Sequence, residues 1–232
     1  MKLEICANSY QSAKNAQIAG ADRIELCSEL SVGGITPSYG LLKKVSEEIT
    51  ISVNVLIRPR SGNFCYSDTE FEQIKLDIEL CKKLSFNGIV SGVLNNDNSI
   101  DTKRTKELVE LSKPLSFTFH RAFDCVKNPK ESLQELINLG VDRILTSGLQ
   151  IKAIDGIKLL VELQEIAQNK LIILAGSGIN PQNAKRFKEV GLKEIHSSAS
   201  KNMQQKSATS YFDETQTVSD IETITEILNA IH

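Results

Sequence analysis

The sequence predicts an α/β fold, a single-domain (β/α)8 barrel. Eight short apolar segments alternate with longer stretches whose apolar residues recur at helical spacing. Strict alternation of this kind indicates a parallel sheet with helices outside it. With about 29 residues in each βα unit, the chain fits a closed TIM barrel better than an open doubly wound sheet.

The eight predicted strands are short and apolar. They lie at 3–6, 22–27, 51–58, 87–93, 115–120, 142–147, 171–175 and 194–198. The segment Gly20–Ile24 (GADRI) recurs as Gly140–Ile144 (GVDRI), opening the second and sixth strands. Each glycine suits a left-handed helix end. The recurrence indicates either half-barrel symmetry or reuse of one turn chemistry.

Helix ends are marked by polar side chains and proline. Capping boxes are predicted at Ser67 with Glu70 and at Ser219 with Glu222. The pairs Asn128-Pro129 and Asn180-Pro181 predict an N-cap followed by proline in the first turn. Lys113-Pro114 ends the helix before the fifth strand.

The chain shows no linker between domains. We therefore expect one domain over residues 1–232. A polar loop at about 199–218 follows the last strand, either as a lid over the barrel mouth or as a simple connection. A C-terminal helix is expected at about 219–231.

Composition excludes several partner classes. The formal net charge is −2, so there is no basic excess for a nucleic acid backbone. No apolar run is long enough to cross a membrane, and the N-terminus does not have the pattern of a signal peptide. The five cysteines form no CxxC pair, which favours a reducing, cytoplasmic location over a disulfide framework or structural zinc site.

Polar residues at the ends of the strands are candidates for function, because active sites of such barrels lie there. The acid–base candidates are Glu4, Glu25, His120 and Asp124. Alternatively, both glutamates are structural partners of Arg58 or Arg121. A strand histidine such as His120 can equally be a satisfied core residue.

A second group of strand-end residues suits an anion. Arginine binds carboxylate and phosphate, and glycine-rich turns after strand seven often hold phosphate. The candidates are Arg58, Arg60, Arg121, Gly176, Ser177, Gly178, His196, Ser197 and Ser198. The alternative for the glycine segment is a tight turn without a ligand.

Two cysteines are predicted on adjacent strands. Cys6 shares a strand face with Glu4, and Cys27 shares one with Glu25. Soft thiolates are good ligands for Cu(I), whereas a buried cysteine can also be only a small apolar residue.

Several motifs together resemble the CutC family. They include Ile24–Ser28 (IELCS), Gly33–Ser38 (GGITPS), Ile57–Arg60 (IRPR), Thr118–Asp124 (TFHRAFD) and Ala175–Gly178 (AGSG), in colinear order over about residues 3–200. The resemblance implies a cytoplasmic TIM barrel, a link to copper homeostasis and, as in some members, Cu(I) binding. The cysteines invoked in that family match Cys6 and Cys27. The sequence departs from the family pattern at 54–56, at 61–65 and at Ser200-Lys201.

Three hypotheses follow. The first is a copper-binding protein of the CutC type, with Cu(I) at Cys6 and Cys27 in the barrel mouth. The second is an enzyme or binding protein for a small anionic, even phosphorylated, metabolite. The third is a scaffold that acts through oligomerisation. By analogy with other barrels, we expect a homodimer or another homo-oligomer.

Overall fold

Eight parallel strands close into a barrel in the computed structural model, which describes residues 1–203 and 216–232. The strands are β1 (Lys2–Ala7), β2 (Arg23–Leu26), β3 (Ser52–Leu56), β4 (Gly88–Ser91), β5 (Ser116–Phe119), β6 (Arg143–Thr146), β7 (Ile172–Gly176) and β8 (Glu194–Ser197). Each pairs with the next in sequence, and β8 closes on β1 with Glu4 opposite His196. The predicted (β/α)8 barrel is confirmed.

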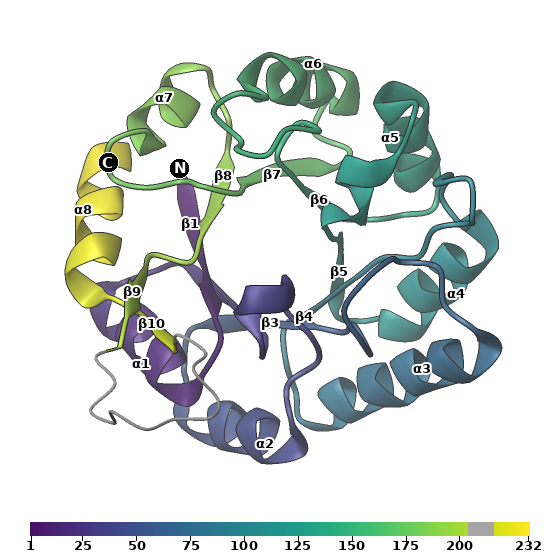
Figure 1. Cartoon of the computed structure of the whole chain (residues 1–232), viewed down its shortest axis with the longest axis horizontal. Helices are drawn as coiled ribbons and strands as arrows, with labels where there is room; N and C mark the ends of the chain where they lie inside the picture. Colours follow the sequence, from purple (N-terminus) through teal and green to yellow (C-terminus); the bar gives the residue numbers. More distant parts are fainter. Residues whose placement is uncertain (204–215) are drawn as a thin grey trace, which may run out of the picture.

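The helices surround the barrel (Figure 1). They are α1 (Tyr10–Ala19), α2 (Tyr39–Glu48), α3 (Asp68–Lys83), α4 (Thr102–Ser112), α5 (Pro129–Asn138), α6 (Ile157–Ala167), α7 (Ala184–Glu189) and α8 (Ile221–Ile231). Two short 3₁₀ helices, η1 (Leu30–Val32) and η2 (Arg121–Cys125), lie in the loops after β2 and β5. These two loops help to shape the barrel mouth.

Successive side chains on each strand point alternately towards the helices and into the barrel interior. Apolar residues such as Ile5, Val55 and Ile195 belong to the main core, which packs strands against helices. A separate small cluster inside the barrel contains Cys6, Cys27, Leu56 and Val90. Most of the remaining interior positions are polar or charged, and this is unusual for a core.

Two of the predicted helix starts are wrong. Ser219 lies in β10, and α8 is capped instead by Asp220, whose carboxylate accepts a bond from Thr223 N. The chain at Asn180 makes a turn, and α7 begins later, at Ala184. At α8 the cap is thus one residue nearer the helix than predicted. At α7 the predicted N-cap belongs to a turn that precedes the helix.

The other predicted helix ends are present. Ser67 and Glu70 form both bonds of the capping box. The helix α5 starts at Pro129, although the Asn128 side chain bonds Glu131 rather than the backbone. The helix α4 ends at Ser112, directly before Lys113-Pro114.

The repeated segment has the same structure in both copies. Gly20 and Gly140 have φ of +86° and +79°, as expected for left-handed helix ends. The carboxylates of Asp22 and Asp142 each accept a 2.8 Å bond from the backbone of the preceding strand. The copies start β2 and β6, as predicted.

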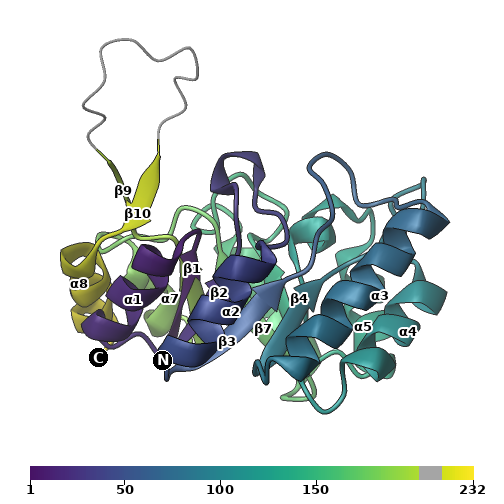
Figure 2. The same cartoon turned by 90° about the horizontal axis from the view of Figure 1, so that it is seen from below.

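The C-terminal segment adds a hairpin to the barrel. Two short strands, β9 (Ser200–Asn202) and β10 (Thr217–Ser219), pair antiparallel and project from one end, opposite the termini (Figure 2). Most of the predicted 199–218 loop, residues 204–215, lies outside the described residues. Among the helices described, none has the length and apolarity needed to span a bilayer.

Candidate functional site

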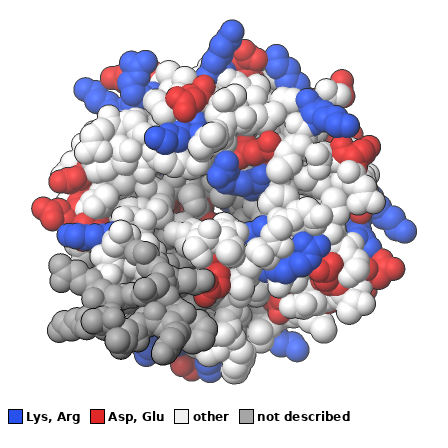
Figure 3. Space-filling view, viewed as in Figure 1, with Lys and Arg blue, Asp and Glu red and all other residues white. Residues whose placement is uncertain are grey.

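A cavity of about 490 Å³ lies at the C-terminal ends of the strands. Figure 3 shows the hollow at the centre of this face, with acidic and basic side chains around it. The residues that line it come from most of the strand ends: Cys6, Glu25, Leu30, Val32, Gly33, Leu56, Arg58, Phe64, His120, Arg121, Asp124, Cys125, Leu145, Ser177, Gly178, Ile179, His196, Ser197 and Ser198. It is the size of an ordinary small-molecule site.

One side of this cavity, the cysteine side, is built by β1, β2 and β8. Its residues are Glu4, Cys6, Glu25, Cys27 and His196. The Sγ atoms of Cys6 and Cys27 are 3.6 Å apart. Cys6 lines the cavity, whereas Cys27 is fully buried behind it. The hydrogen bond to Cys27 and burial raise the pKa of Cys6 well above its usual value, so Cys6 is held as a thiol.

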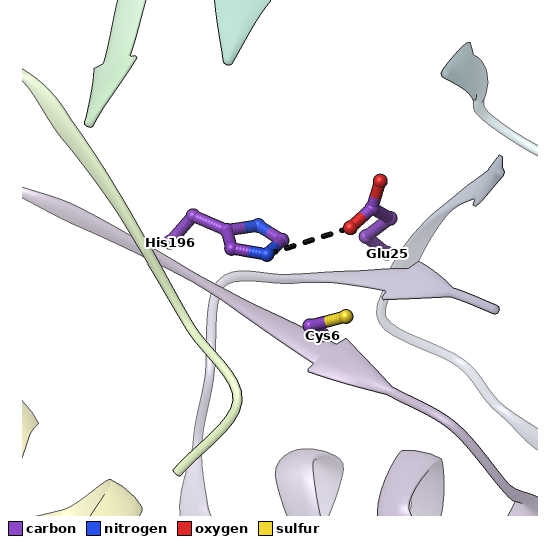
Figure 4. Close-up of side chains that lie close together, drawn as sticks. All are labelled: Cys6, Glu25 and His196. Atoms are coloured by element: carbon purple, nitrogen blue, oxygen red, sulfur yellow. Dashed lines mark ion pairs between the residues drawn. The ribbon is translucent and has the colours of Figure 1, made fainter. Parts of the chain in front are cut away.

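His196 joins the two carboxylates of the cysteine side. Figure 4 shows its ring pointing from β8 towards Glu25 on β2, with Cys6 beside both. Its Nε2 lies 3.4 Å from Glu25 Oε2, and its Nδ1 lies 2.9 Å from Glu4 Oε1. Cys6, Glu25 and His196 form a cluster in which one possible metal-ligand atom from each residue lies within 4.8 Å of the other two. These are ligand types that transition metals use.

Beneath this cluster lies a buried ion network. Arg23 pairs with Glu4, and its Nη2 reaches Glu194 at 2.6 Å. Arg143 Nε binds the same Glu194 oxygen at 2.8 Å. The predicted pairing of Glu4 and Glu25 with Arg58 or Arg121 is therefore wrong. Arg23 and Glu194 are not among the predicted site residues because they lie within strands rather than at their C-terminal ends. The available signal is the alternation of charged residues on one strand face, Arg23 with Glu25 and Glu194 with His196.

The two glutamates have opposite protonation tendencies. Burial acts to raise the pKa of Glu4, but Arg23 and His196 outweigh it and lower the pKa to about 2. Burial raises the pKa of Glu25, and the nearby Glu4 charge adds to this against the opposing effect of His196. Burial opposes the charge of His196, yet Cys6 and the two carboxylates raise its pKa well above 6.5. Glu4 is thus a fixed charge that orients the ring.

The opposite side, the His120 side, is built by the ends of β5 and β6 and by η2. Its polar residues are His120, Arg121, Asp124 and Ser147. His120 is buried, and its ring lies 4.7 Å from the Phe64 ring between centroids. Burial, with Arg58 nearby, lowers its pKa to about 3. His120 is therefore neutral at physiological pH.

Asp124 organises the loop after β6. Its carboxylate accepts bonds from the Ser147 and Leu149 backbone and from the Thr146 hydroxyl. It also accepts a hydrogen bond of 2.7 Å from Arg121 Nε. With its lone pairs directed at these donors, Asp124 is a positioning group for Arg121.

Arg58 and Arg60, the other two arginines predicted to bind an anion, donate hydrogen bonds to loop backbone instead. Arg58 lines the cavity, but its Nη atoms donate to the backbone oxygens of Val32, Gly34 and Gly62. Arg60 lies outside the cavity lining, bound to Glu70 and to backbone oxygens. Of the three arginines, the structure leaves Arg121 the most open to a ligand.

The segment after β7 and the end of β8 also line the cavity, through Ser177, Gly178, Ser197 and Ser198. Ser177 and Ser197 donate their hydroxyl protons to backbone oxygens at 2.7 Å. Ser198 bonds Ser200 at 3.1 Å. Gly176 lies outside the lining, but a Cβ there would stand 2.5 Å from Leu145 and 3.2 Å from His196. The missing side chain therefore makes room for the His196 ring.

Comparison with known proteins places this chain in one family. Residues 1–201 match the model of the CutC family. A CutC family protein from Edwardsiella ictaluri is 48% identical over 86% of this chain and 79% of its own length, and one from Proteus mirabilis is 49% identical over 86% and 80%. A crystal structure of a putative copper homeostasis protein CutC from Streptococcus agalactiae is 36% identical, covers 85% of this chain and 98% of its own, and has a TM-score of 0.81. The chain belongs to the CutC family.

Proposed function

We propose that this chain binds Cu(I) at the cysteine side of the cavity, as part of copper homeostasis. The observation that carries the proposal is the 3.6 Å separation of the Cys6 and Cys27 sulfur atoms. Metal–sulfur bonds of about 2.3 Å allow two sulfurs at this distance to reach one ion. The related Streptococcus agalactiae protein, described as a putative copper homeostasis protein, supports the link to copper homeostasis.

The residues around the thiols suit Cu(I) rather than a hard cation. Thiolates are soft ligands, and imidazole also binds copper. His196 belongs to the cluster, and its Nδ1 faces Glu4, an arrangement that orients metal-binding histidines. We assign Cys6 and Cys27 as the ligands and His196 as the third donor. Glu25 is a hard oxygen donor, which suits Cu(I) poorly, so we do not assign it as a ligand.

Anaerobic titration of reduced protein with Cu(I) against a competing chelator tests this function. We expect one Cu(I) per chain, and at least a hundredfold weaker binding in the Cys6→Ser/Cys27→Ser double variant. The matched control is Cys65→Ser/Cys125→Ser, which removes two thiols outside the pair and should bind as the wild type does. Equal binding by both double variants would contradict the proposal.

A further inference from the structure

The His120 side of the cavity holds a buried hydrogen-bond donor that has no acceptor among the described residues. His120 is only 4% exposed. Its Nδ1 accepts a bond from Ala122 N at 3.3 Å, so a neutral ring carries its proton on Nε2. That Nε2 has no partner in the described chain. Buried polar groups are nearly always satisfied, so an unpartnered donor on a residue that lines the cavity points to a ligand.

A second donor stands at the rim of the same cavity. Arg121 is held at two points, by Nε to Asp124 at 2.7 Å and by Nη2 to Ser147 at 3.1 Å. Its Nη1 makes no bond within the described residues, and the side chain is 43% exposed. The guanidinium is thus fixed in place with one nitrogen free for an anion.

The rest of the wall limits what the anion can be. The same cavity is also lined by apolar side chains such as Leu30, Val32 and Leu145, which suit a carbon skeleton. The hydroxyl protons of Ser177 and Ser197 are already given to backbone oxygens. Arg121 and His120 together therefore offer donors for a carboxylate and one further oxygen.

We infer that the His120 side binds a small organic acid, whose carboxylate pairs with Arg121 and whose neighbouring oxo or hydroxyl oxygen accepts the Nε2 hydrogen of His120. Each contact satisfies a donor that the folded chain leaves open. The site uses none of the proposed copper ligands, so it is independent of copper binding. The cavity volume of about 490 Å³ accommodates such a molecule.

The test compares acids that differ in one oxygen. Reduced, metal-free protein is titrated by calorimetry and thermal shift with pyruvate, lactate and propionate at matched ionic strength, and with inorganic phosphate. Pyruvate or lactate should bind at least about fivefold more tightly than propionate, because only they satisfy the buried donor. Phosphate should bind no better than propionate.

Variants assign the two contacts. Arg121→Gln should weaken all three carboxylates about tenfold, whereas Arg60→Gln, outside the cavity, should change nothing. His120→Phe should remove the preference over propionate, and His120→Gln, which keeps an N–H donor and reports on folding, should retain part of it. The Cys6→Ser/Cys27→Ser variant should bind the acids as the wild type does.

Several outcomes would overturn the inference. Equal affinity for pyruvate, lactate and propionate would remove the role of His120. Unchanged affinities in Arg121→Gln would remove the role of Arg121. Loss of acid binding in the double cysteine variant would place the acid on the cysteine side. Stronger binding of phosphate than of the acids would make the site a phosphate site.

Discussion

The cysteine side and the His120 side of the cavity place their histidines in opposite electrostatic environments. The cysteine side gathers thiols, carboxylates and a histidine whose pKa is raised, and it rests on buried arginines inside the barrel. The His120 side holds a histidine whose pKa is lowered to about 3 and an arginine fixed by one carboxylate. Two histidines in one cavity are thus pushed in opposite directions by their neighbours.

The difference arises from what lies behind each ring. His196 has Glu4 and Glu25 within 3.4 Å of its two nitrogens, so charge is stabilised there. His120 has Phe64 and Phe119 against its ring and Arg58 nearby, so charge is disfavoured. The first environment suits a metal ion, and the second suits a neutral hydrogen-bond donor. The comparison predicts that the two sides can be disabled separately.

The largest expected effect lies beneath the cysteine side. Arg23→Ala leaves Glu4 without its main partner and weakens the pairing of Glu194, both buried. We expect the free energy of unfolding to fall by about 3–5 kcal/mol, measured by urea denaturation, because a buried charge is left uncompensated. Arg186→Ala, which breaks an exposed pair with Glu189, is the control and should change it by less than about 0.5 kcal/mol. If Arg23→Ala lowered the free energy of unfolding no more than Arg186→Ala does, the buried network would not stabilise the fold.

The next effect concerns pH and the His120 side. The folded pKa of about 3 lies below the ordinary 6.5, so the unfolded chain binds the proton first as pH falls. His120 should therefore lower the free energy of unfolding as pH falls from 6.5 towards 3, by up to about 1.4 kcal/mol per pH unit. Above pH 6.5 this contribution is constant.

Urea denaturation at several pH values between 6.5 and 5 measures this slope. The range stays above the window in which Glu4 titrates, since its pKa moves from 4.5 to about 2 on folding. His120→Gln should show a shallower slope by the same amount. An identical slope in the variant and the wild type would show that His120 is not held neutral.

Two glycine substitutions should affect the two sides separately. A Cβ on Gly34, at φ +85°, would stand 2.7 Å from Leu56 and 3.4 Å from Cys27. A Cβ on Gly92 would stand 2.7 Å from His120 Nδ1. We expect each alanine variant to lose about 1–3 kcal/mol of stability. Gly34→Ala should weaken Cu(I) binding, and Gly92→Ala should weaken binding of the organic acid.

The control for both is Gly40→Ala in α2, where a Cβ meets no atom within 4 Å. Because alanine favours the helix, this variant should be as stable as the wild type or slightly more so. Chelator competition and calorimetry measure the two affinities. If either variant weakened both ligands equally, the cavity would behave as one site rather than as two sides.

The smallest expected effect is at Cys125, an exposed thiol that lines the rim near Asp124. Cys125→Ser should leave the Cu(I) affinity within a factor of two of the wild type, as measured by chelator competition. The reason is that the proposed ligands are on the other side of the cavity. A larger loss would extend the copper site across to the His120 side.

The sequence by itself determined the architecture. Alternating apolar periods, glycines at helix ends and the repeated GADRI and GVDRI segments are local signals, and they predicted all eight strands and their order. The motifs were also sufficient for the family, which depends on residue identity alone. The position of the candidate residues at strand ends followed from the fold class.

Only the tertiary structure decided which of these residues meet. Arg23, Glu194 and Arg143 are far apart in the chain, and their network forms because a closed barrel brings β2, β6 and β8 to one interior. The same closure gives His196 its carboxylate partners and leaves Arg58 bound to loop oxygens. Hydrogen-bond partners and protonation depend on distances between strands, and no local pattern encodes those distances.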